Sequence, residues 1–250
     1  MIEIKNIHKS FGSLKVLEGL DLTINTGESM VIIGRSGCGK SVLLKHIIGL
    51  MKPDEGKVFV DGEEISSAGS KELDRIRMDF GMLFQGAALF DSLTVFENVA
   101  FRLMEYTDMS YNEMRERVAQ CLGMVGLRGI ESAKPAQLSG GMKKRVGLAR
   151  AISMSPKIIL FDEPTTGVDP IMGDIINKLI RNLHDTLKVT SITVTHDMKS
   201  AYEIADRIAM LYDKKIIAIG TPDEIKNSDN RVVQQFINGE SEGPITSTSK

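Results

Sequence analysis

The sequence predicts an α/β protein whose core of strands and helices is interrupted by a helical insertion. The first third of the chain is rich in strand patterns, and a glycine-rich stretch at 34–41 joins a strand to a helix. Residues 92–156 then show helical patterns before buried strand patterns return. We expect one domain over 1–238, with a helical subdomain inserted at about 86–156.

The composition is that of an ordinary globular protein, with 42% hydrophobic and 26% charged residues and a net charge of −2. This charge gives no electrostatic case for nucleic acid, and we expect no such partner. The two cysteines, Cys38 and Cys121, indicate neither a disulfide framework nor a zinc cluster. The chain start lacks a secretory signal, and no apolar run approaches the ~18 residues of a membrane span. We expect a cytosolic chain that another protein would hold at a membrane.

Strand patterns fill the first third of the chain. Ile2, Ile4 and Ile7 open the run, and it continues with "LKVLEGLDLTI", "SMVIIG" and "KVFVDGEEI". One helix interrupts these strands. It begins near Gly39 and is apolar nearly all round, which predicts that it is buried.

The second half returns to strand patterns at "KIILFDEP" and "TSITVTHD". The helix between them carries apolar residues at helical spacing, namely Ile171, Ile175, Leu179 and Leu183. "DRIAMLYDKKIIAIG" predicts a closing hairpin. The polar tail at 239–250 is expected to be poorly ordered, with docking on a neighbouring copy as the alternative.

The glycine-rich stretch "GRSGCGKS" matches G-x-x-x-x-G-K-[ST] between a strand and a helix, which is the context that a phosphate loop requires. Its glycines let successive N–H groups face a phosphate, and the helix N-terminus adds its dipole. A turn without a ligand would not require Lys and Ser at the last two positions. The residues expected to contact the nucleotide are Gly34, Arg35, Ser36, Gly37, Cys38, Gly39, Lys40, Ser41 and Val42. Cys38 is either a small tolerated residue or a redox-sensitive thiol.

The buried strand "IILFDEP" ends in two adjacent carboxylates, at the strand end where ligands bind in doubly wound sheets. Asp162 is the expected Mg²⁺ partner, with the Ser41 hydroxyl as a further ligand. Glu163 is placed to polarise an attacking water as general base. An ordinary acidic pair in a turn is the alternative. Together with the phosphate loop, these carboxylates indicate binding and hydrolysis of a nucleoside triphosphate.

A second candidate anion site begins at "LSGGMKKRVGLARA", residues 138–151. Ser139 is a predicted helix N-cap, and the N-terminus of that helix offers N–H groups and a positive dipole end. Lys143, Lys144 and Arg145 are expected on a solvated helix face, with attraction to lipid headgroups as the alternative.

These motifs and their order resemble the ATPase subunit of ATP-binding-cassette (ABC) transporters over residues 1–238. The resemblance implies a P-loop NTPase core with an N-terminal antiparallel β subdomain and an inserted helical subdomain. It also implies a role for each matched position. Phe11, where Tyr is commoner, would stack on adenine, and His196 would contact the γ-phosphate. Gln85 would link the γ-phosphate and Mg²⁺ to the helical subdomain. Leu138–Met142 would be the family signature, and Asp169 would lie in the loop between subunits.

The stretches "GKSVLLKHIIGL", "GMLFQGAALFDSLTVFENVAF", "QLSGGMKKRVGLARAI" and "FDEPTTGVDPI" resemble more specifically the ATPases of Mla/Mce-type lipid transporters. That subgroup implies transport of lipid, chiefly phospholipid, between the inner membrane and the outer envelope. Val42, where Thr is usual in the wider family, is typical of the subgroup. Import of an amino acid or an osmolyte is the alternative, followed by a soluble ABC ATPase without a transport role.

The resemblance implies a homodimer that sandwiches two ATP molecules with Mg²⁺. Each site would join the phosphate loop, Gln85, Asp162, Glu163 and His196 of one copy to Ser139, Gly140 and Gly141 of the other. The partners implied are integral membrane permease subunits, a periplasmic Mce-type lipid-binding subunit and a small accessory subunit. The place implied is the cytoplasmic face of the inner membrane. The apolar stretch "GAALFDSLTVF" after Gln85 is either a groove for a permease helix or local core.

Overall fold

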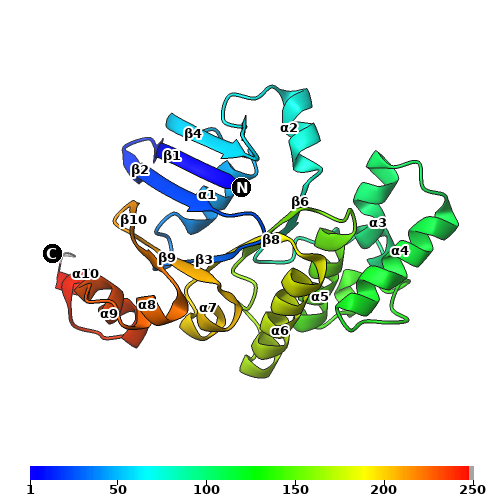
Figure 1. Ribbon diagram of the computed structural model, residues 1–250. Helices are drawn as coiled ribbons and strands as arrows, with labels where there is room; N and C mark the ends of the chain where they lie inside the picture. Colours follow the sequence, from blue (N-terminus) through cyan, green and yellow to red (C-terminus); the bar gives the residue numbers. More distant parts are fainter. Residues whose placement is uncertain (248–250) are drawn as a thin grey trace. The chain divides into compact units, whose positions relative to one another are not determined.

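The computed structural model describes residues 1–247 (Figure 1). The chain divides into two compact units. Unit 1 comprises Met1–Ala68 and the segment from Val194 onward, and unit 2 comprises Gly69–Thr193. The insertion predicted at 86–156 lies wholly within unit 2, which extends beyond it on both sides.

Unit 1 begins with a four-stranded antiparallel sheet in the order β2-β1-β4-β5, of which Figure 1 labels the first three strands. Its strands are β1 (Ile2–Phe11), β2 (Leu14–Ile24), β4 (Glu55–Val60) and β5 (Glu63–Glu64). Ile2 pairs with Ile24 and with Val60, and all three side chains are buried. Apolar residues that alternate along these strands therefore share one buried face.

Three further strands of unit 1 lie side by side in the order β10-β9-β3. They are β3 (Ser29–Ile33), β9 (Arg207–Tyr212) and β10 (Lys215–Gly220). β3 runs parallel to β9, whereas β9 and β10 form the predicted hairpin. Its turn residues Asp213 and Lys214 have φ values of 43° and 70°, as a tight hairpin turn requires.

The helices of unit 1 are α1 (Lys40–Ile47), α7 (Met198–Ile204), α8 (Pro222–Lys226), α9 (Arg231–Asn238) and α10 (Pro244–Ser247). α1 is less buried than its apolar sequence predicts, because Val42 and Ile48 are only half-buried and Leu50, just beyond the helix, is 52% exposed. The remaining four helices were not expected from the sequence.

The tail is ordered up to residue 247, which corrects the expectation for residues 239–247. The buried Gln235 side chain donates to the oxygens of Glu240 and Thr246, and it accepts from Ile245 N at 2.7 Å. Ile245 is itself buried. Polar composition did not reveal this order, because it depends on one buried amide that forms hydrogen bonds with the segment at 240–246. Residues 248–250 of the tail lie outside the described residues.

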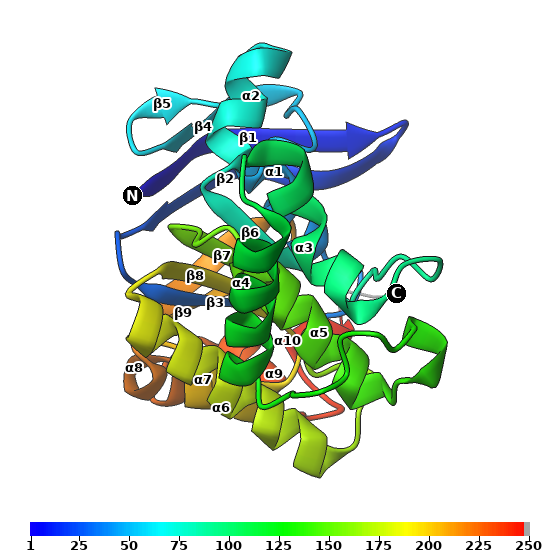
Figure 2. The same ribbon diagram turned by 90° about the vertical axis from the view of Figure 1, so that its right-hand side faces the viewer.

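Unit 2 contains α2 (Ser70–Arg77), β6 (Phe80–Leu83), α3 (Val95–Tyr106), α4 (Tyr111–Met124), the 3₁₀ turn Pro135–Gln137, α5 (Gly140–Ile152), β7 (Ile158–Asp162), α6 (Pro170–Leu187) and most of β8 (Thr190–Thr195). The unit boundary falls within β8, after Thr193. Its strands lie in the order β8-β7-β6. α3 and α4 each begin with a capping box, at Thr94 and Ser110. Both helices pack on α5 (Figure 2).

α6 forms where the sequence predicts a helix, but its buried face differs. Ile171 is 76% exposed and Ile175 is 39% exposed, whereas Ile176, Ile180 and Leu183 are buried. Two apolar stripes at helical spacing overlap in this segment, and packing selected the one that includes the small Gly173.

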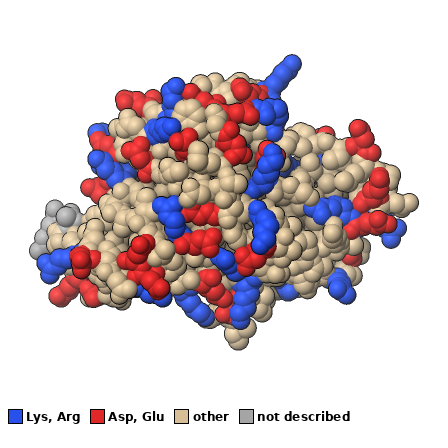
Figure 3. Space-filling model, in the orientation of Figure 1, with Lys and Arg blue, Asp and Glu red and all other residues tan. Residues whose placement is uncertain are grey.

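Charged side chains of both signs are interspersed over the face seen in Figure 3. Several form exposed ion pairs, such as Lys178 with Asp174 at 2.7 Å along α6. Among the described residues, no helix is both long and apolar enough to cross a membrane.

Candidate functional site

The phosphate loop of unit 1 connects β3 to α1. All five residues of β3 are buried, so Gly34 follows directly from the core. Gly34 has a φ of 157°, and a Cβ there would lie 2.5 Å from the backbone oxygen of Leu211. Gly39 has a φ of 110°, and its Cβ would lie 2.9 Å from the Val16 side chain. Only glycine lets the loop curl this closely past its neighbours.

The Lys40 ammonium lies inside the curl of this loop. Its Nζ donates to the backbone oxygens of Gly34 at 2.9 Å and Arg35 at 3.0 Å, and the residue is only 5% exposed. The other predicted contact residues range from exposed (Arg35, Ser36, Gly37) through half-buried (Cys38, Ser41, Val42) to buried (Gly34, Gly39). A cation within a ring of backbone groups at a helix start is suited to bind a phosphate.

A hollow of about 290 Å³ adjoins the loop. It is lined by Leu14, Lys15, Val16, residues 35–38 and residues 211–214. Phe11 is not among the lining residues. It ends β1, is 47% exposed, and has the Lys9 ammonium 5.7 Å from its ring centroid. Its predicted contact with adenine stays a prediction.

His196 follows β8 and is exposed. The next residue, Asp197, caps α7 by accepting from Lys199 N at 3.1 Å and Ser200 N at 3.3 Å. The imidazole therefore stands at a strand end fixed by the following helix cap. Its predicted contact with a γ-phosphate stays a prediction.

In unit 2, the parallel strands β6 and β7 bring three predicted site residues to one sheet edge. Leu83 pairs with Phe161 at the carboxyl ends of these strands. Gln85 follows the first strand, and Asp162 and Glu163 end and follow the second. Gln85 is exposed, whereas Asp162 and Glu163 are 9% and 8% exposed. Ligands of α/β sheets bind at such strand ends.

The backbone of Glu163 adopts the left-handed conformation, with a φ of 48°. For a residue other than glycine this conformation costs free energy and persists where the surroundings hold it. Thr166 provides part of that support. Its N–H donates to the Glu163 backbone oxygen at 3.2 Å, and its hydroxyl donates to Glu163 Oε2 at 3.1 Å. The carboxylate is therefore fixed in direction, as a general base requires.

The N-terminus of α5 is the second anion site that the sequence predicts. Ser139 caps the helix, its Oγ accepting from Met142 N at 3.2 Å. Ser139 and Gly140 are exposed, and Gly141 is buried against the Met172 side chain of α6. Asp169 caps α6, so the structure brings Asp169 and the start of α5 together within unit 2.

Lys144 corrects the expectation of a solvated face at 143–145. Lys143 and Arg145 are half-buried, but Lys144 is only 5% exposed. Its Nζ donates to the backbone oxygen of Gln85 and, at 3.3 Å, to that of Glu163. Burial lowers the pKa of Lys144, and the carboxylates of Asp162 and Glu163 oppose that shift.

The helical period could have revealed this lysine. Lys144 is three residues after Gly141, four before Leu148 and seven before Ala151, and these three residues are buried. Counting a 3.6-residue period from the buried positions places Lys144 on the same face. Its charge obscured that signal.

The predicted Mg²⁺ ligands are the oxygens of Ser41, Gln85 and Asp162, which are hard donors of the kind that Mg²⁺ prefers. Asp162 is nearly buried at a strand end, where a carboxylate is stabilised by a cation. Each of these oxygen donors suits the ion by its chemistry. Within residues 1–247, no group of three or more His, Cys, Asp and Glu side chains could hold a metal.

Comparisons with known sequences and structures show what this chain is similar to. A family model described as ABC transporter matches residues 17–166. The chain is 43% identical over 98% of its length to the probable ribonucleotide transport ATP-binding protein mkl of Mycobacterium tuberculosis, covering 68% of that protein. It is 42% identical to the intermembrane phospholipid transport system ATP-binding protein MlaF of Haemophilus influenzae, covering 98% of this chain and 93% of that one.

The fold is similar to that of a solved dimeric cassette. The ATP-binding cassette MJ0796, described as a post-hydrolysis dimer bound to ADP and Pi, has a TM-score of 0.82 and 36% identity. The match covers 89% of this chain and 99% of that one.

Proposed function

The chain belongs to the ABC transporter family and is an ATP-binding and ATP-hydrolysing subunit. On this basis we propose that it powers phospholipid transport between an inner membrane and an outer envelope. It works as a homodimer on the cytoplasmic face of the inner membrane, bound to permease subunits. A periplasmic Mce-type lipid-binding subunit and a small accessory subunit complete the complex.

The names of the relatives disagree on the cargo. MlaF is named for phospholipid, whereas mkl is named for ribonucleotide with the qualifier probable. A chloroplast relative from Arabidopsis thaliana, 42% identical, is named for trigalactosyldiacylglycerol, a lipid. We favour lipid because the names of relatives from a bacterium and a plant both refer to a lipid. Amino-acid or osmolyte import, and an ABC ATPase without transport, are the alternatives.

In the proposed site, the backbone of 34–39 and the Lys40 ammonium bind the phosphates of ATP. Ser41, Gln85 and Asp162 hold Mg²⁺, which neutralises charge on the phosphate oxygens. Glu163 accepts the proton of the attacking water, and His196 contacts the γ-phosphate. Phe11 stacks on the adenine, and Asp169 acts in the loop between the two copies.

The observation that carries the dimer is the exposed start of α5. Its N–H groups and dipole attract an anion, and Ser139 and Gly140 are open to solvent. The neighbouring Ile171 side chain is 76% exposed, as an apolar residue covered by a partner would be. Ser139, Gly140 and Gly141 then bind the γ-phosphate held by the other copy, so that hydrolysis removes the charge that joins the pair.

Two inactive variants test this arrangement when they are mixed. Lys40→Ala removes the phosphate-binding cation, and Ser139→Arg blocks the α5 start while leaving ATP binding by the monomer intact. If each site joins Lys40 of one copy to Ser139 of the other, a mixed dimer keeps one intact site. An equal mixture should then recover about a quarter of the wild-type rate, since half of randomly paired dimers are mixed.

Steady-state ATPase assays on each variant alone and on the mixture give the answer. If both residues serve the same copy's nucleotide, no mixed dimer has an intact site and the mixture stays inactive. Loss of ATP affinity in monomeric Ser139→Arg would likewise contradict the proposal. Ser139→Thr, which keeps the capping hydroxyl, is the control for folding.

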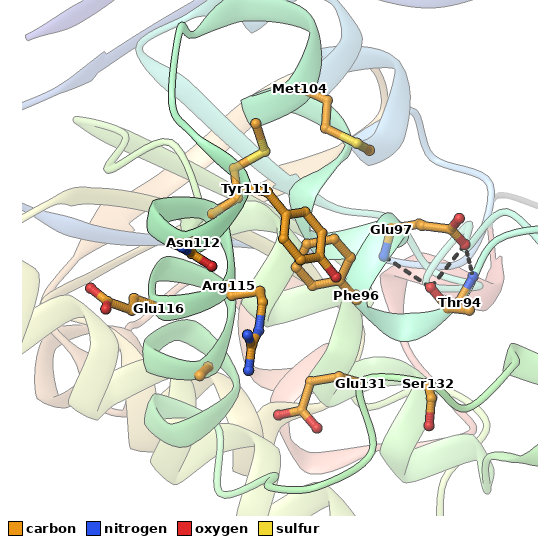
Figure 4. A pocket seen from close by; sticks show the side chains of 12 residues that line it. Thr94, Phe96, Glu97, Met104, Tyr111, Asn112, Arg115, Glu116, Glu131 and Ser132 are labelled. Carbon is orange, nitrogen blue, oxygen red and sulfur yellow. Dashed lines mark hydrogen bonds between the residues drawn. The ribbon is translucent and has the colours of Figure 1, made fainter.

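We propose that the permease helix binds in a hollow of about 930 Å³ between α3 and α4 (Figure 4). Met104 and Tyr111 line it and are 44% and 65% exposed, and the Tyr111 ring lies 5.5 Å from that of Phe96. The predicted groove stretch at 86–96 contributes only Thr94 and Phe96 to this hollow. Ala87 and Val95 are buried, and Phe90 is 45% exposed but does not line the hollow. Only part of that stretch is thus free to meet a partner.

Tyr111→Asp should abolish co-purification with the permease after detergent extraction, because it removes an aromatic contact and adds a negative charge to a hollow already lined by Glu97, Glu116 and Glu131. ATP hydrolysis by the isolated subunit should be unchanged. Tyr106→Asp is the control, since Tyr106 is 58% exposed but does not line the hollow. Retention of the permease by Tyr111→Asp would refute this docking site.

Lipid mass spectrometry of the purified complex tests the cargo. Co-purified phospholipid that is released or moved on ATP addition supports the proposal. ATP-dependent uptake of a nucleotide, amino acid or osmolyte by the reconstituted complex would replace it.

A further inference from the structure

Three residues of α5 contact the chain between Leu83, at the end of β6, and Ala88. Lys144 donates to the oxygen of Gln85. At Gly147 a Cβ would lie 2.6 Å from Leu83 Cδ1 and 3.4 Å from Ala87 Cβ, so the helix backbone touches this segment. Arg150 donates to the oxygens of Ala87 at 2.6 Å and Ala88 at 2.7 Å. The backbone around Gln85 is therefore held by α5 on both sides.

Ala87 and Ala88 have φ values of 60° and 46°. Two consecutive non-glycine residues in the left-handed region are strained and need external support. The Arg150 guanidinium provides it through its two hydrogen bonds. Gln85 therefore lies in a turn that is closed locally by the hydrogen bond from Ala87 N to the Phe84 oxygen at 2.8 Å and held from outside by α5.

Lys144 differs from Arg150 because it also contacts Glu163. The Glu163 oxygen that accepts from Lys144 belongs to the peptide that follows the residue with a φ of 48°. One ammonium therefore joins α5, the Gln85 backbone and the strained turn that aims the Glu163 carboxylate. Lys144 is almost completely buried, so water cannot readily take the place of these hydrogen bonds if they are lost. The loss therefore leaves buried polar groups without partners, which is unfavourable.

The same helix begins at the exposed Ser139. Lys144 lies five residues further on, which is about 7 Å along the axis of an α-helix. Over that distance the hydrogen-bonded helix moves as one body. A displacement of its start is therefore carried to the carbonyls that Lys144 holds.

We propose that Lys144 is a positioning residue that couples the α5 start to Gln85 and Glu163 of the same chain, so that hydrolysis follows engagement of Ser139. This inference rests on the proposed ATP-dependent dimer. It assigns no contact between Lys144 and the nucleotide. Loss of Lys144 should slow the chemical step while leaving ATP binding and dimer formation in place.

Lys144→Met keeps the aliphatic stem and removes the donor. Its kcat should fall at least about tenfold, as expected when a catalytic group is misplaced. ATP affinity measured by titration should stay within about threefold, since a misplaced base changes the transition state and not ground-state binding. Light scattering should show more ATP-bound dimer than in the wild type. Lys144→Arg, which restores donors, should recover most of the rate.

Lys143→Met is the matched control, one position away on α5 and half-buried, and its rate should equal that of the wild type. A Lys144→Met rate within about threefold of wild type would overturn the coupling. Equal losses of ATP affinity and kcat that Lys144→Arg does not restore would also overturn it, because they indicate a general structural role. If Lys144→Met does not fold, Lys144→Gln is held to the same criteria.

The two proposals fail in different ways. If the equal mixture of Lys40→Ala and Ser139→Arg stays inactive, the proposed dimer fails, and the coupling fails with it. If Glu163→Gln is inactive but Lys144→Met is not, the function stands and only the coupling fails.

Discussion

The cap at the start of α6 makes a measurable contribution that can be separated from any role of Asp169 between subunits. Asp169 Oδ1 accepts from Ile171 N at 3.1 Å and from Met172 N at 3.0 Å. Pro170 occupies the first helical position and has no N–H to satisfy. A single oxygen therefore pairs both donors of the first turn. Loss of an N-cap costs about 0.5–2 kcal/mol, and this double acceptor belongs in the upper half of that range.

Asp169→Ala should lower the Tm by about 3–6 °C. The smaller shift is expected if the whole chain melts as one cooperative unit, and the larger shift if unit 2 melts alone. Asp169→Asn keeps an oxygen that caps equally well and should stay within about 2 °C of wild type. Scanning calorimetry without nucleotide measures both variants. Equal Tm values for Asp169→Ala and wild type would refute the capping argument.

The same pair of variants tests the predicted intersubunit role. If the Asp169 carboxylate acts in the dimer, Asp169→Asn should reduce ATPase activity at an unchanged Tm. Full activity of Asp169→Asn would restrict this residue to capping its own helix.

Two other predictions concern the base and the pH dependence of stability. Glu163→Gln should lower turnover by about 10²–10⁴, with ATP-bound dimer accumulating, because its amide oxygen can still accept from Thr166 but cannot take a proton; near-normal hydrolysis would exclude Glu163 as base. Burial lowers the pKa of His46 below its usual 6.5, although Nδ1 bonds the Val42 oxygen at 2.7 Å. The unfolded chain therefore binds more protons between the lowered pKa and 6.5, so stability should fall as pH falls through that window. Thermal melts should show a larger loss for wild type than for His46→Gln, and equal losses would refute this.

Local chemistry was readable from the sequence. The phosphate loop depends on glycine, lysine and serine positions within eight residues, and the chain there is constrained by its own backbone. The cap at Ser139 and the acidic pair after a buried strand are likewise short-range features. Strand and helix types followed because side-chain periodicity reflects local geometry.

Contacts between distant segments were not readable. β6 is four residues long and is stabilised by pairing with β7, about 80 residues later, so its own pattern carries little signal. The buried face of α6 was misassigned because two apolar stripes compete and only packing chooses between them. The order of the tail depends on the single buried Gln235.

By itself, the sequence "LSGGMKKRVGLARA" determined a capped helix start suited to an anion. Only the tertiary structure decided that the lysine five residues later is buried, and that its ammonium binds carbonyls of two other segments. The physical reason is that a cap is satisfied within one turn of chain. A buried cation needs acceptors, and their positions are fixed only when segments far apart in the sequence fold together.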